Sequence, residues 1–171
     1  MTITRLDAEG FAAAVPVLAD LLVDAVAGGA SVGFLEGFDR DAAIVWWRDR
    51  AAAVAGGSLV VWTAAGPSGV CGTISLAYAE KPNARHRAEI VKLAVHREAR
   101  GRGLGRQLLA AAERAAADSG RTLLLLDTET ASAAERLYES AGWTRYGIVP
   151  DYAAGPDGVL ADCSFYYKNL V

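Results

Sequence analysis

The sequence predicts an α/β fold with a central β-α-β crossover, formed by a single domain over residues 1–171. The length suits one domain, since domains commonly have about 100–200 residues. With 53% hydrophobic and 22% charged residues, the composition is that of a globular chain, and a chain of this length buries about 70% of its surface on folding. In the second half of the chain, two β-rich segments flank an amphipathic helix, an order typical of parallel strands joined by a crossover.

Two helices are predicted in the first third of the chain. The first spans residues 8–27 and ends at the glycine pair 28–29. The second spans residues 40–55, with Asp39 as its N-cap and a second glycine pair at 56–57 as its stop. Both helices should therefore precede most of the sheet.

A hairpin comes next, because two β-rich segments (59–64 and 70–78) surround the turn sequence GPSG. The remaining predicted elements are a strand over 88–96, an amphipathic helix from Leu104 to Gly120, an apolar strand over 123–127, a helix over 132–141, and strands over 143–149 and 164–168. The predicted order is α-α-β-β-β-α-β-α-β-β.

Charge and cysteine content exclude several classes of function. The net charge of −3 disfavours general nucleic-acid binding. We found no signal-peptide pattern and no apolar run approaching about 18 residues, so we expect a cytoplasmic protein that does not bind a membrane. Cys71 and Cys163 are far apart and form no C-x-x-C pair, which predicts buried free thiols. The cysteines and histidines do not provide four ligands at zinc spacing, so no metal is expected.

The most informative segment is RGRGLG at residues 100–105, between a predicted strand and a predicted helix. Backbone N–H groups at a helix N-terminus bind anions, and glycine lets a phosphate approach the main chain. Residues 97–106 contain four arginines and one glutamate, a local charge of +3 in an acidic protein. This concentration of positive charge indicates an anion site.

Two common phosphate-binding motifs do not fit this segment. A nucleoside-triphosphate P-loop ends in Gly-Lys-Ser/Thr, which is absent here. The dinucleotide fingerprint G-x-G-x-x-G requires a third glycine at position 106 or 108, and those positions hold Arg106 and Leu108. The spacing found is R-x-x-G-x-G.

This R-x-x-G-x-G segment resembles the pyrophosphate-binding loop of the GCN5-related N-acetyltransferase (GNAT) family, which binds acetyl-CoA. The resemblance implies a mixed, mostly antiparallel sheet flanked by helices, with acetyl-CoA as co-substrate. The cofactor-binding residues it implies in the loop are Arg100, Gly101, Arg102, Gly103, Leu104, Gly105 and Arg106. Backbone N–H groups near Leu93, Ala94 and Val95 would hold the thioester.

A second match lies at residues 132–143, SAAERLYESAGW, which resembles the later helix of the family, A-x-x-L-Y-x-x-x-G-F/W. The resemblance implies that Tyr138 is the general acid near the CoA sulfur; a tyrosine of the core or of an interface is the alternative. Ser132 stands where the family often contacts the cofactor, and it is equally well placed as a plain N-cap.

Two carboxylates are candidates for the general base. Glu89 falls where the histone-acetylating branch has its base, although a regular pleat would group Glu89 with the apolar Val91 and Leu93. A hydrated cleft or a bulge would explain a carboxylate on such a face. Asp127, at the end of an apolar strand, is the rival base; a solvated glutamate and a turn aspartate are the alternatives.

The acceptor should bind near the glycine-rich loop 28–39, with Val32, Gly33 and Phe34 as candidate contacts and Trp46 and Trp47 as further lining or ordinary core aromatics. The resemblance is closest to the tabtoxin-resistance type of GNAT. It implies acetyl transfer to a small amine, such as an amino acid, toxin or antibiotic, in a ternary complex, and a homodimer. The alternatives are a protein or peptide amine as acceptor, or a non-catalytic CoA-binding module.

Overall fold

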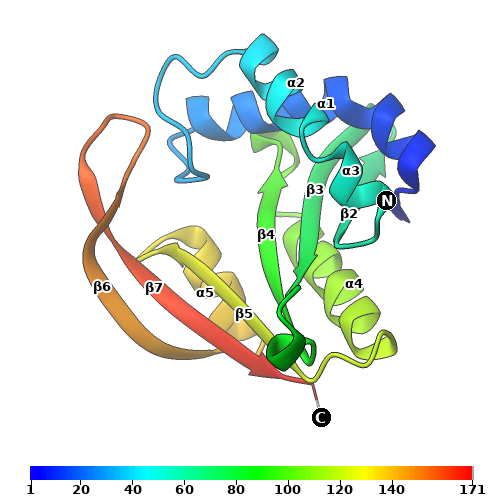
Figure 1. Ribbon diagram of the computed structural model, residues 1–171. Helices are drawn as coiled ribbons and strands as arrows, with labels where there is room; N and C mark the ends of the chain where they lie inside the picture. Colours follow the sequence, from blue (N-terminus) through cyan, green and yellow to red (C-terminus); the bar gives the residue numbers. More distant parts are fainter. Residues whose placement is uncertain (171) are drawn as a thin grey trace.

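The computed structural model describes residues 1–170. Its seven strands form one sheet in the order β1-β2-β3-β4-β5-β7-β6, in which β4 and β5 are parallel and all other neighbours are antiparallel (Figure 1). The strands are β1 (Thr2–Arg5), β2 (Leu59–Gly66), β3 (Gly69–Tyr78), β4 (Arg87–Val95), β5 (Leu123–Glu129), β6 (Thr144–Ala154) and β7 (Leu160–Asn169). The helices are α1 (Ala8–Ala27), α2 (Arg40–Arg48), α3 (Ala51–Ala55), α4 (Leu104–Asp118) and α5 (Ala133–Ser140), with short 3₁₀ turns at Pro82–Ala84 and Arg97–Ala99. The predicted mixed α/β fold with its β-α-β crossover is confirmed.

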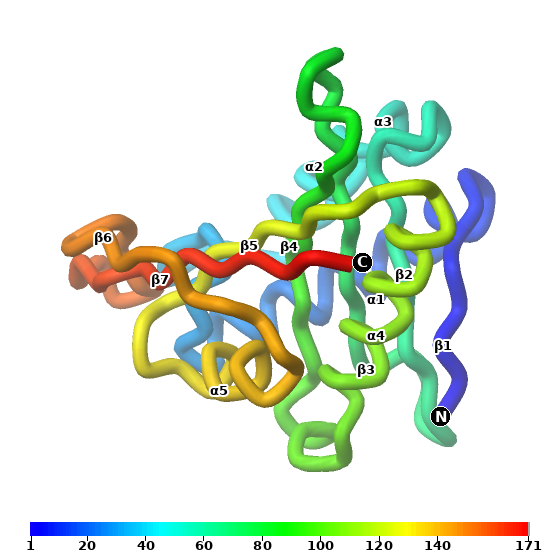
Figure 2. The backbone as a smooth tube through the Cα atoms, turned by 90° about the horizontal axis from the view of Figure 1, so that it is seen from below, coloured from blue at the N-terminus to red at the C-terminus, as the bar shows by residue number. Residues whose placement is uncertain are grey.

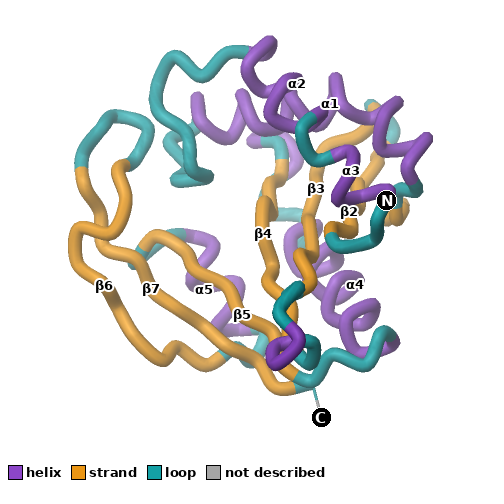
Figure 3. The backbone as a smooth tube through the Cα atoms, viewed as in Figure 1, coloured by secondary structure: helices purple, strands orange, loops and turns teal. Residues whose placement is uncertain are grey.

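Helices cover both faces of the sheet (Figure 3). Alternate residues of β2 belong to different cores: Val60 and Trp62 pack with α4, whereas Val61 packs with α1 and α2. This is the two-residue period of a strand buried on both faces. The α4 side contains the larger core, which extends to Tyr138 and Trp143.

Helix α1 starts at the N-cap Asp7, whose carboxylate accepts a 2.7 Å hydrogen bond from the N–H of Gly10. By length and composition α1 could cross a membrane, which the sequence reading did not anticipate. Half of its most apolar 18-residue segment is nevertheless buried inside the protein, and the buried residues include Phe11, Leu18 and Leu22. Burial against α2 and β2 accounts for this apolar character as that of a core helix.

The predicted helix over 40–55 is two helices, α2 and α3, separated at Asp49 and Arg50. The N–H of Arg50 bonds the carbonyl of Trp47, three residues back, which is a 3₁₀ contact rather than an α-helical one. The Arg50 guanidinium folds back over the ring of Trp46 and donates to the Trp46 carbonyl at 2.5 Å. The N-cap at Asp39 is as predicted.

The first strand and the last two strands differ from the prediction. Strand β1 was missed because it has four residues and a single apolar side chain, Ile3, and its pairing with β2 places it in the sheet. The final hairpin is longer than predicted, since β6 reaches Ala154 and β7 begins at Leu160. Seen from below, β5, β7 and β6 diverge from β1 to β4, so that the sheet opens at its centre (Figure 2).

Candidate active site

The centre of the sheet contains a cleft where β4 and β5 separate. The two strands pair over three residues, from Arg87 and Leu123 to Glu89 and Leu125, and form no pairs beyond that point. A cavity of about 800 Å³ opens there, bordered by the second half of β4, the end of β5 and the first turn of α4. The unpaired edge of β4 leaves backbone polar groups facing this cavity.

A β-bulge shapes the β4 wall of the cleft. Ser75 pairs with Val91 and Thr73 pairs with Ala94, so Lys92 and Leu93 together oppose the single residue Ile74. Lys92 adopts a left-handed backbone with φ of 53°, which is uncommon for a non-glycine residue. The bulge changes which face each later residue occupies.

This bulge corrects the predicted grouping of Glu89 with Leu93. Ile90 and Leu93 are three residues apart, yet both pack into the core on the α4 side, which a regular strand does not permit. Glu89 instead lies on the opposite, open face, where its side chain is exposed. The extra residue in β4 therefore takes Leu93 into the core and away from the face that Glu89 occupies.

The predicted thioester-binding segment borders the cleft. Leu93, Ala94 and Val95 all line the cavity, and Ala94 and Val95 pair with β3 on their other edge. The carbonyl of Val95 accepts a 3.0 Å hydrogen bond from Nε of Arg100. This contact ties the start of the glycine-rich loop to the end of β4.

The glycine-rich loop leads directly into α4. Gly101 and Gly103 have φ of 74° and 75°, and no atom lies within 4 Å of where a Cβ would stand on either residue. Gly103 is the N-cap of α4 and provides no side-chain cap, so the first N–H groups of the helix have no partner from that side chain. An open cradle with free N–H groups fits a phosphate of acetyl-CoA.

The arginines of the loop do not act as one cluster. Arg100 lines the cleft and Arg102 does not. Arg106 lines it too, but its guanidinium donates to the carbonyl and the hydroxyl of Ser140, at 3.2 and 2.6 Å. Arg97 is bound by the carboxylate of Asp24 at the end of α1. Of the arginines that give the segment its local charge of +3, Arg100 therefore faces the anion site, whereas Arg97 and Arg106 bind residues of α1 and α5.

The two candidate bases lie close enough to interact. Asp127 lines the cleft, and its negative charge contributes to raising the pKa of Glu89, after the larger effect of partial desolvation by the surrounding protein. Glu89 itself does not line the cavity; it stands where β4 and β5 stop pairing. A carboxyl group whose pKa is raised beside a second carboxylate is a candidate for proton transfer.

Tyr138 lines the cleft from α5 and is 5% exposed. Its ring packs against Trp143 and Tyr166 at 6.0 and 6.3 Å between centroids. Burial, followed by the negative charge of Asp127, raises the pKa of the phenol well above its usual value. This tyrosine therefore keeps its proton across the physiological pH range.

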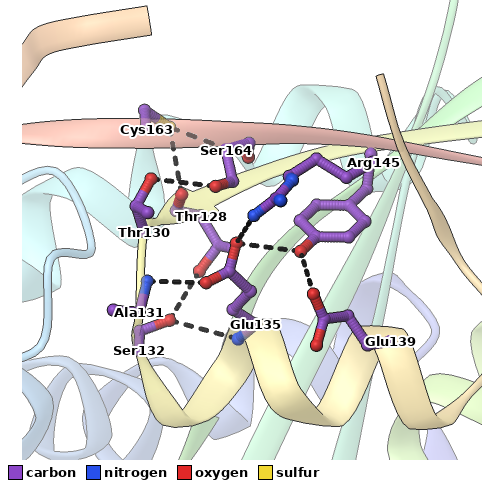
Figure 4. A network of polar contacts seen from close by, with 10 residues as sticks. Thr128, Thr130, Ala131, Ser132, Glu135, Glu139, Arg145, Cys163 and Ser164 are labelled. Carbon is purple, nitrogen blue, oxygen red and sulfur yellow. Dashed lines mark hydrogen bonds and ion pairs between the residues drawn. The ribbon is translucent and has the colours of Figure 1, made fainter. Parts of the chain in front are cut away.

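Ser132 forms the N-cap of α5, because its hydroxyl accepts a 3.1 Å hydrogen bond from the N–H of Glu135. The same hydroxyl lies 3.3 Å from that of Thr128, and Ser132 also lines the cleft. Glu135 returns toward the turn and accepts a 2.6 Å bond from the N–H of Ala131 (Figure 4). The serine is thus an N-cap, and its position also suits contact with a ligand.

The predicted acceptor residues do not all reach the cleft. Val32 and Gly33 line it, whereas Phe34 does not. Phe34 stacks on Phe38 at 3.8 Å and meets the edge of Trp46 at 5.5 Å. Trp46 packs beside these rings, and Trp47 is fully buried in the core formed by α1 and α2.

Among the residues that line the cleft and that sequence reasoning did not assign to the site are Lys92, Thr128, Tyr152 and Cys163. Lys92 reaches the cleft because of the bulge, and no local sequence pattern indicates that bulge. Thr128 comes directly after Asp127, and the extension of β5 past Asp127 could have indicated it. Tyr152 and Cys163 belong to the β6–β7 hairpin, and only its long-range pairing brings them here.

Within residues 1–170, no three His, Cys, Asp or Glu side chains gather as a metal site would require. A second cavity of about 600 Å³ adjoins the cleft between α1, the α1–α2 loop and the tip of the β6–β7 hairpin. The loop and the tip meet there, since the N–H of Glu36 donates to the carbonyl of Pro156 at 2.7 Å.

Comparison with known proteins places these features in a family. Residues 56–145 match the model of the acetyltransferase (GNAT) domain. This range includes β2 to α5, and with them the bulge, the glycine-rich loop and both candidate bases.

Solved structures of similar fold span nearly the whole chain. One is yncA, a provisionally assigned acetyltransferase of Salmonella typhimurium with its cofactor acetyl-CoA, with a TM-score of 0.80 and 24% identity over 100% of this chain and 94% of that one. A ribosomal-protein-alanine N-acetyltransferase of Brucella melitensis gives 0.77 and 24% over 99% of both chains. A provisionally assigned phosphinothricin N-acetyltransferase gives 0.78 and 22%, also over 99% of both.

Proposed function

The chain belongs to the GNAT family of acetyltransferases, and from this premise we propose that it transfers the acetyl group of acetyl-CoA to the amine of a small molecule. The observation that carries the proposal is the single cleft between β4 and β5. That cleft joins the glycine cradle at α4, the unpaired edge of β4, Asp127 and Tyr138. Anion binding, thioester binding and proton transfer thus meet in one place.

In the proposed reaction, acetyl-CoA and the acceptor bind together. The N–H groups at the start of α4 and the cradle at Gly101 and Gly103 bind the pyrophosphate. The unpaired backbone edge near Leu93 to Val95 holds the thioester carbonyl and the negative charge that develops on it. Both contacts come from main-chain groups, so they depend on the bulge and on the separation of the strands.

The amine must lose a proton to react. An alkyl amine with a pKa near 10.4 is unprotonated in about one molecule in 2,500 at pH 7. We assign Glu89, together with Asp127 or through water, to accept that proton. The amine nitrogen then bonds to the acetyl carbon, the carbon–sulfur bond breaks, and the CoA thiolate takes a proton from Tyr138. The nitrogen, which still carries one proton too many for an amide, gives that proton through water to the Tyr138 phenolate, so the tyrosine is restored.

The contact between the α1–α2 loop and the tip of the β6–β7 hairpin supports a small molecule as acceptor rather than a peptide. The hydrogen bond between Glu36 and Pro156 joins the α1–α2 loop to the β6–β7 tip beside the cleft. An extended peptide crossing the cleft at this side would have to displace that contact. The proteins of similar fold include one named for a ribosomal-protein acceptor and one named for a small-molecule acceptor. The fold is therefore compatible with both classes of acceptor, and the proposal rests on the contact beside the cleft.

Calorimetric titration with acetyl-CoA tests the cofactor. We expect micromolar binding, about −8 kcal/mol. The variant Gly103→Glu should abolish it, because a carboxylate would fill the cradle. Gly120→Glu is the matched control: Gly120 has φ of 77°, equally open surroundings and a place at the far end of α4.

Wild-type protein that fails to bind acetyl-CoA would overturn the proposed function. Equal binding by the two glutamate variants would show that the cradle does not hold the phosphates. A thiol-release assay with a panel of amines then decides between a small acceptor and a peptide.

A further inference from the structure

Lys92 is a cleft residue to which neither the fold nor the proposed chemistry assigns a role. It occupies the bulge of β4, where its left-handed backbone directs the side chain away from the α4 core and toward the α1–α2 loop. Its Nζ donates a 2.8 Å hydrogen bond to the carbonyl of Val32. Val32 and Gly33 line the cleft beside it, so the ammonium group stands on the acceptor side.

The charge of Lys92 has no partner of opposite sign in contact. Across the described chain, no carboxylate lies within 4.0 Å of Nζ. The group is half-buried, and it stands 5.4 Å from the ring of Phe34 and 5.2 Å from that of Trp46. Ring faces attract a cation but do not neutralise it. Burial, and then the charge of Arg50, lower the pKa of Lys92, while the negative charge of Asp127 acts on it in the opposite direction without touching it.

The other charged residues that line the cleft set Lys92 apart from them by position. Three carboxylates, Asp127, Glu129 and Asp162, line the same cavity. The other cations that line it, Arg100 and Arg106, stand at the α4 end with the glycine loop. Lys92 is thus the one lining cation on the acceptor side of the described cleft.

We propose that Lys92 binds a carboxylate on the acceptor, so that the enzyme acts on molecules that carry both an amine and a carboxylate, the class of amino acids. This inference rests on the proposed function. The acceptor carboxylate pairs with Lys92 on β4, while its ammonium group faces Asp127 on β5. The two ends of the acceptor then find opposite charges on opposite walls, which fixes its orientation toward the thioester.

A purely structural role for Lys92 makes a different prediction. The hydrogen bond to Val32 uses one of the three ammonium protons and serves to hold the α1–α2 loop. If that were its whole role, removing the charge would alter stability but not the choice between charged and neutral ligands. Ligand choice is therefore the decisive measurement.

The test is an NMR titration of ¹⁵N-labelled free protein with two probes: N-acetylglycine, which carries a carboxylate, and N-methylacetamide, which lacks it. We expect N-acetylglycine to shift the backbone N–H signals of Val32, Gly33 and Lys92, and N-methylacetamide to leave them in place. Lys92→Met should weaken N-acetylglycine binding about tenfold to a hundredfold. Lys92→Arg should retain most of it.

Lys81→Met is the matched control, because Lys81 is exposed on the loop between β3 and β4 and does not line the cleft. The proposal is overturned if neither probe shifts these signals, if both shift them equally, or if the shifts survive in Lys92→Met. The comparison of probes on wild-type protein decides the matter even if Lys92→Met does not fold. Acetyl-CoA is absent from this titration, so calorimetry with acetyl-CoA separately shows whether the proposed function itself fails.

Discussion

The carboxylate of Glu135 on α5 accepts a 2.9 Å hydrogen bond from the hydroxyl of Tyr166 on β7, and both side chains are buried. The other oxygen of Glu135 accepts from the N–H of Ala131, which has a left-handed φ of 62° (Figure 4). One buried carboxylate thus joins the β5–α5 turn, α5 and the sheet. It holds in place the helix that carries Tyr138 into the cleft.

Replacing Glu135 should therefore destabilise the protein more than replacing its neighbour. Glu135→Ala removes the acceptor of the Ala131 N–H, the nearer of the two carboxylate acceptors of the buried Tyr166 hydroxyl and the partner of Arg145, and we expect the free energy of unfolding to fall by about 3 kcal/mol. Glu139→Ala is the control, since Glu139 is exposed and accepts only a 3.1 Å bond from Tyr166. It should cost under about 1 kcal/mol. Urea denaturation measures both, and equal losses would refute this assignment.

The carboxylate of Glu135 should also make the free energy of unfolding depend on pH in the acidic range. Burial alone would raise the pKa of Glu135, but hydrogen bonds including those from Tyr166 and Ala131 outweigh it and hold the pKa below its ordinary value of 4.5. A lowered pKa in the folded state stabilises the protein above pH 4.5, and that stability is lost as the pH falls through the folded-state pKa. Glu135→Gln should be less stable at pH 7 and lose less stability than wild type between pH 5 and 3. Parallel urea curves at each pH for the two proteins test this.

The interaction of Glu89 with Asp127 predicts a pH profile. If Glu89 is the base, log kcat/KM should rise with pH at a slope of about 2 below its pKa and about 1 above it, because amine and base both lose protons. Desolvation and then the charge of Asp127 place that break above pH 4.5. Asp127→Asn removes the repulsion, so the break should move to lower pH. A variant with no break at all would identify Asp127 as the base instead.

The high pKa of Tyr138 predicts a modest catalytic role. A phenol of raised pKa gives up its proton reluctantly, while a thiol of pKa near 8.5 is a good leaving group without assistance. Tyr138→Phe keeps the packing against Trp143 and should lower kcat less than about tenfold. The double variant Glu89→Gln/Asp127→Asn should lose about 10²–10⁴-fold. Steady-state kinetics that rank the two variants in the opposite order would contradict this.

Local patterns predicted α1 and α4, since the apolar residues of each helix and the glycine that ends it lie within or beside the segment. Ser132 was left open between an N-cap and a cofactor contact, and the structure shows the N-cap. The features that shape the cleft depend on contacts between distant segments. The bulge at Lys92 places a left-handed backbone on a residue type that gives no warning of it. Arg106 was predicted to bind a phosphate, but its guanidinium donates a hydrogen bond to Ser140 of α5, a contact that the local sequence does not indicate. The register of β6 and β7, which brings Cys163 to the cleft, has no local signal.

Cys163 should be inert despite lining the cleft. Its Sγ lies 3.5 Å from Oδ2 of Asp127 and 3.3 Å from the carbonyl of Thr128. Burial and then the charge of Asp127 raise the pKa of the thiol to about 12. Compared with a free thiol of pKa near 8.5, the reactive thiolate is scarcer by about 10³-fold at pH 8, so alkylation by iodoacetamide should be much slower than that of an exposed thiol.

Cys71, which is half-buried, provides an internal reference for the reagent. Asp127→Asn should speed alkylation of Cys163, by about tenfold or less, because it removes a negative charge but leaves the burial in place. Peptide mass spectrometry over a time course follows both cysteines in one sample. Rapid alkylation of Cys163 in wild-type protein would contradict the raised pKa of this thiol.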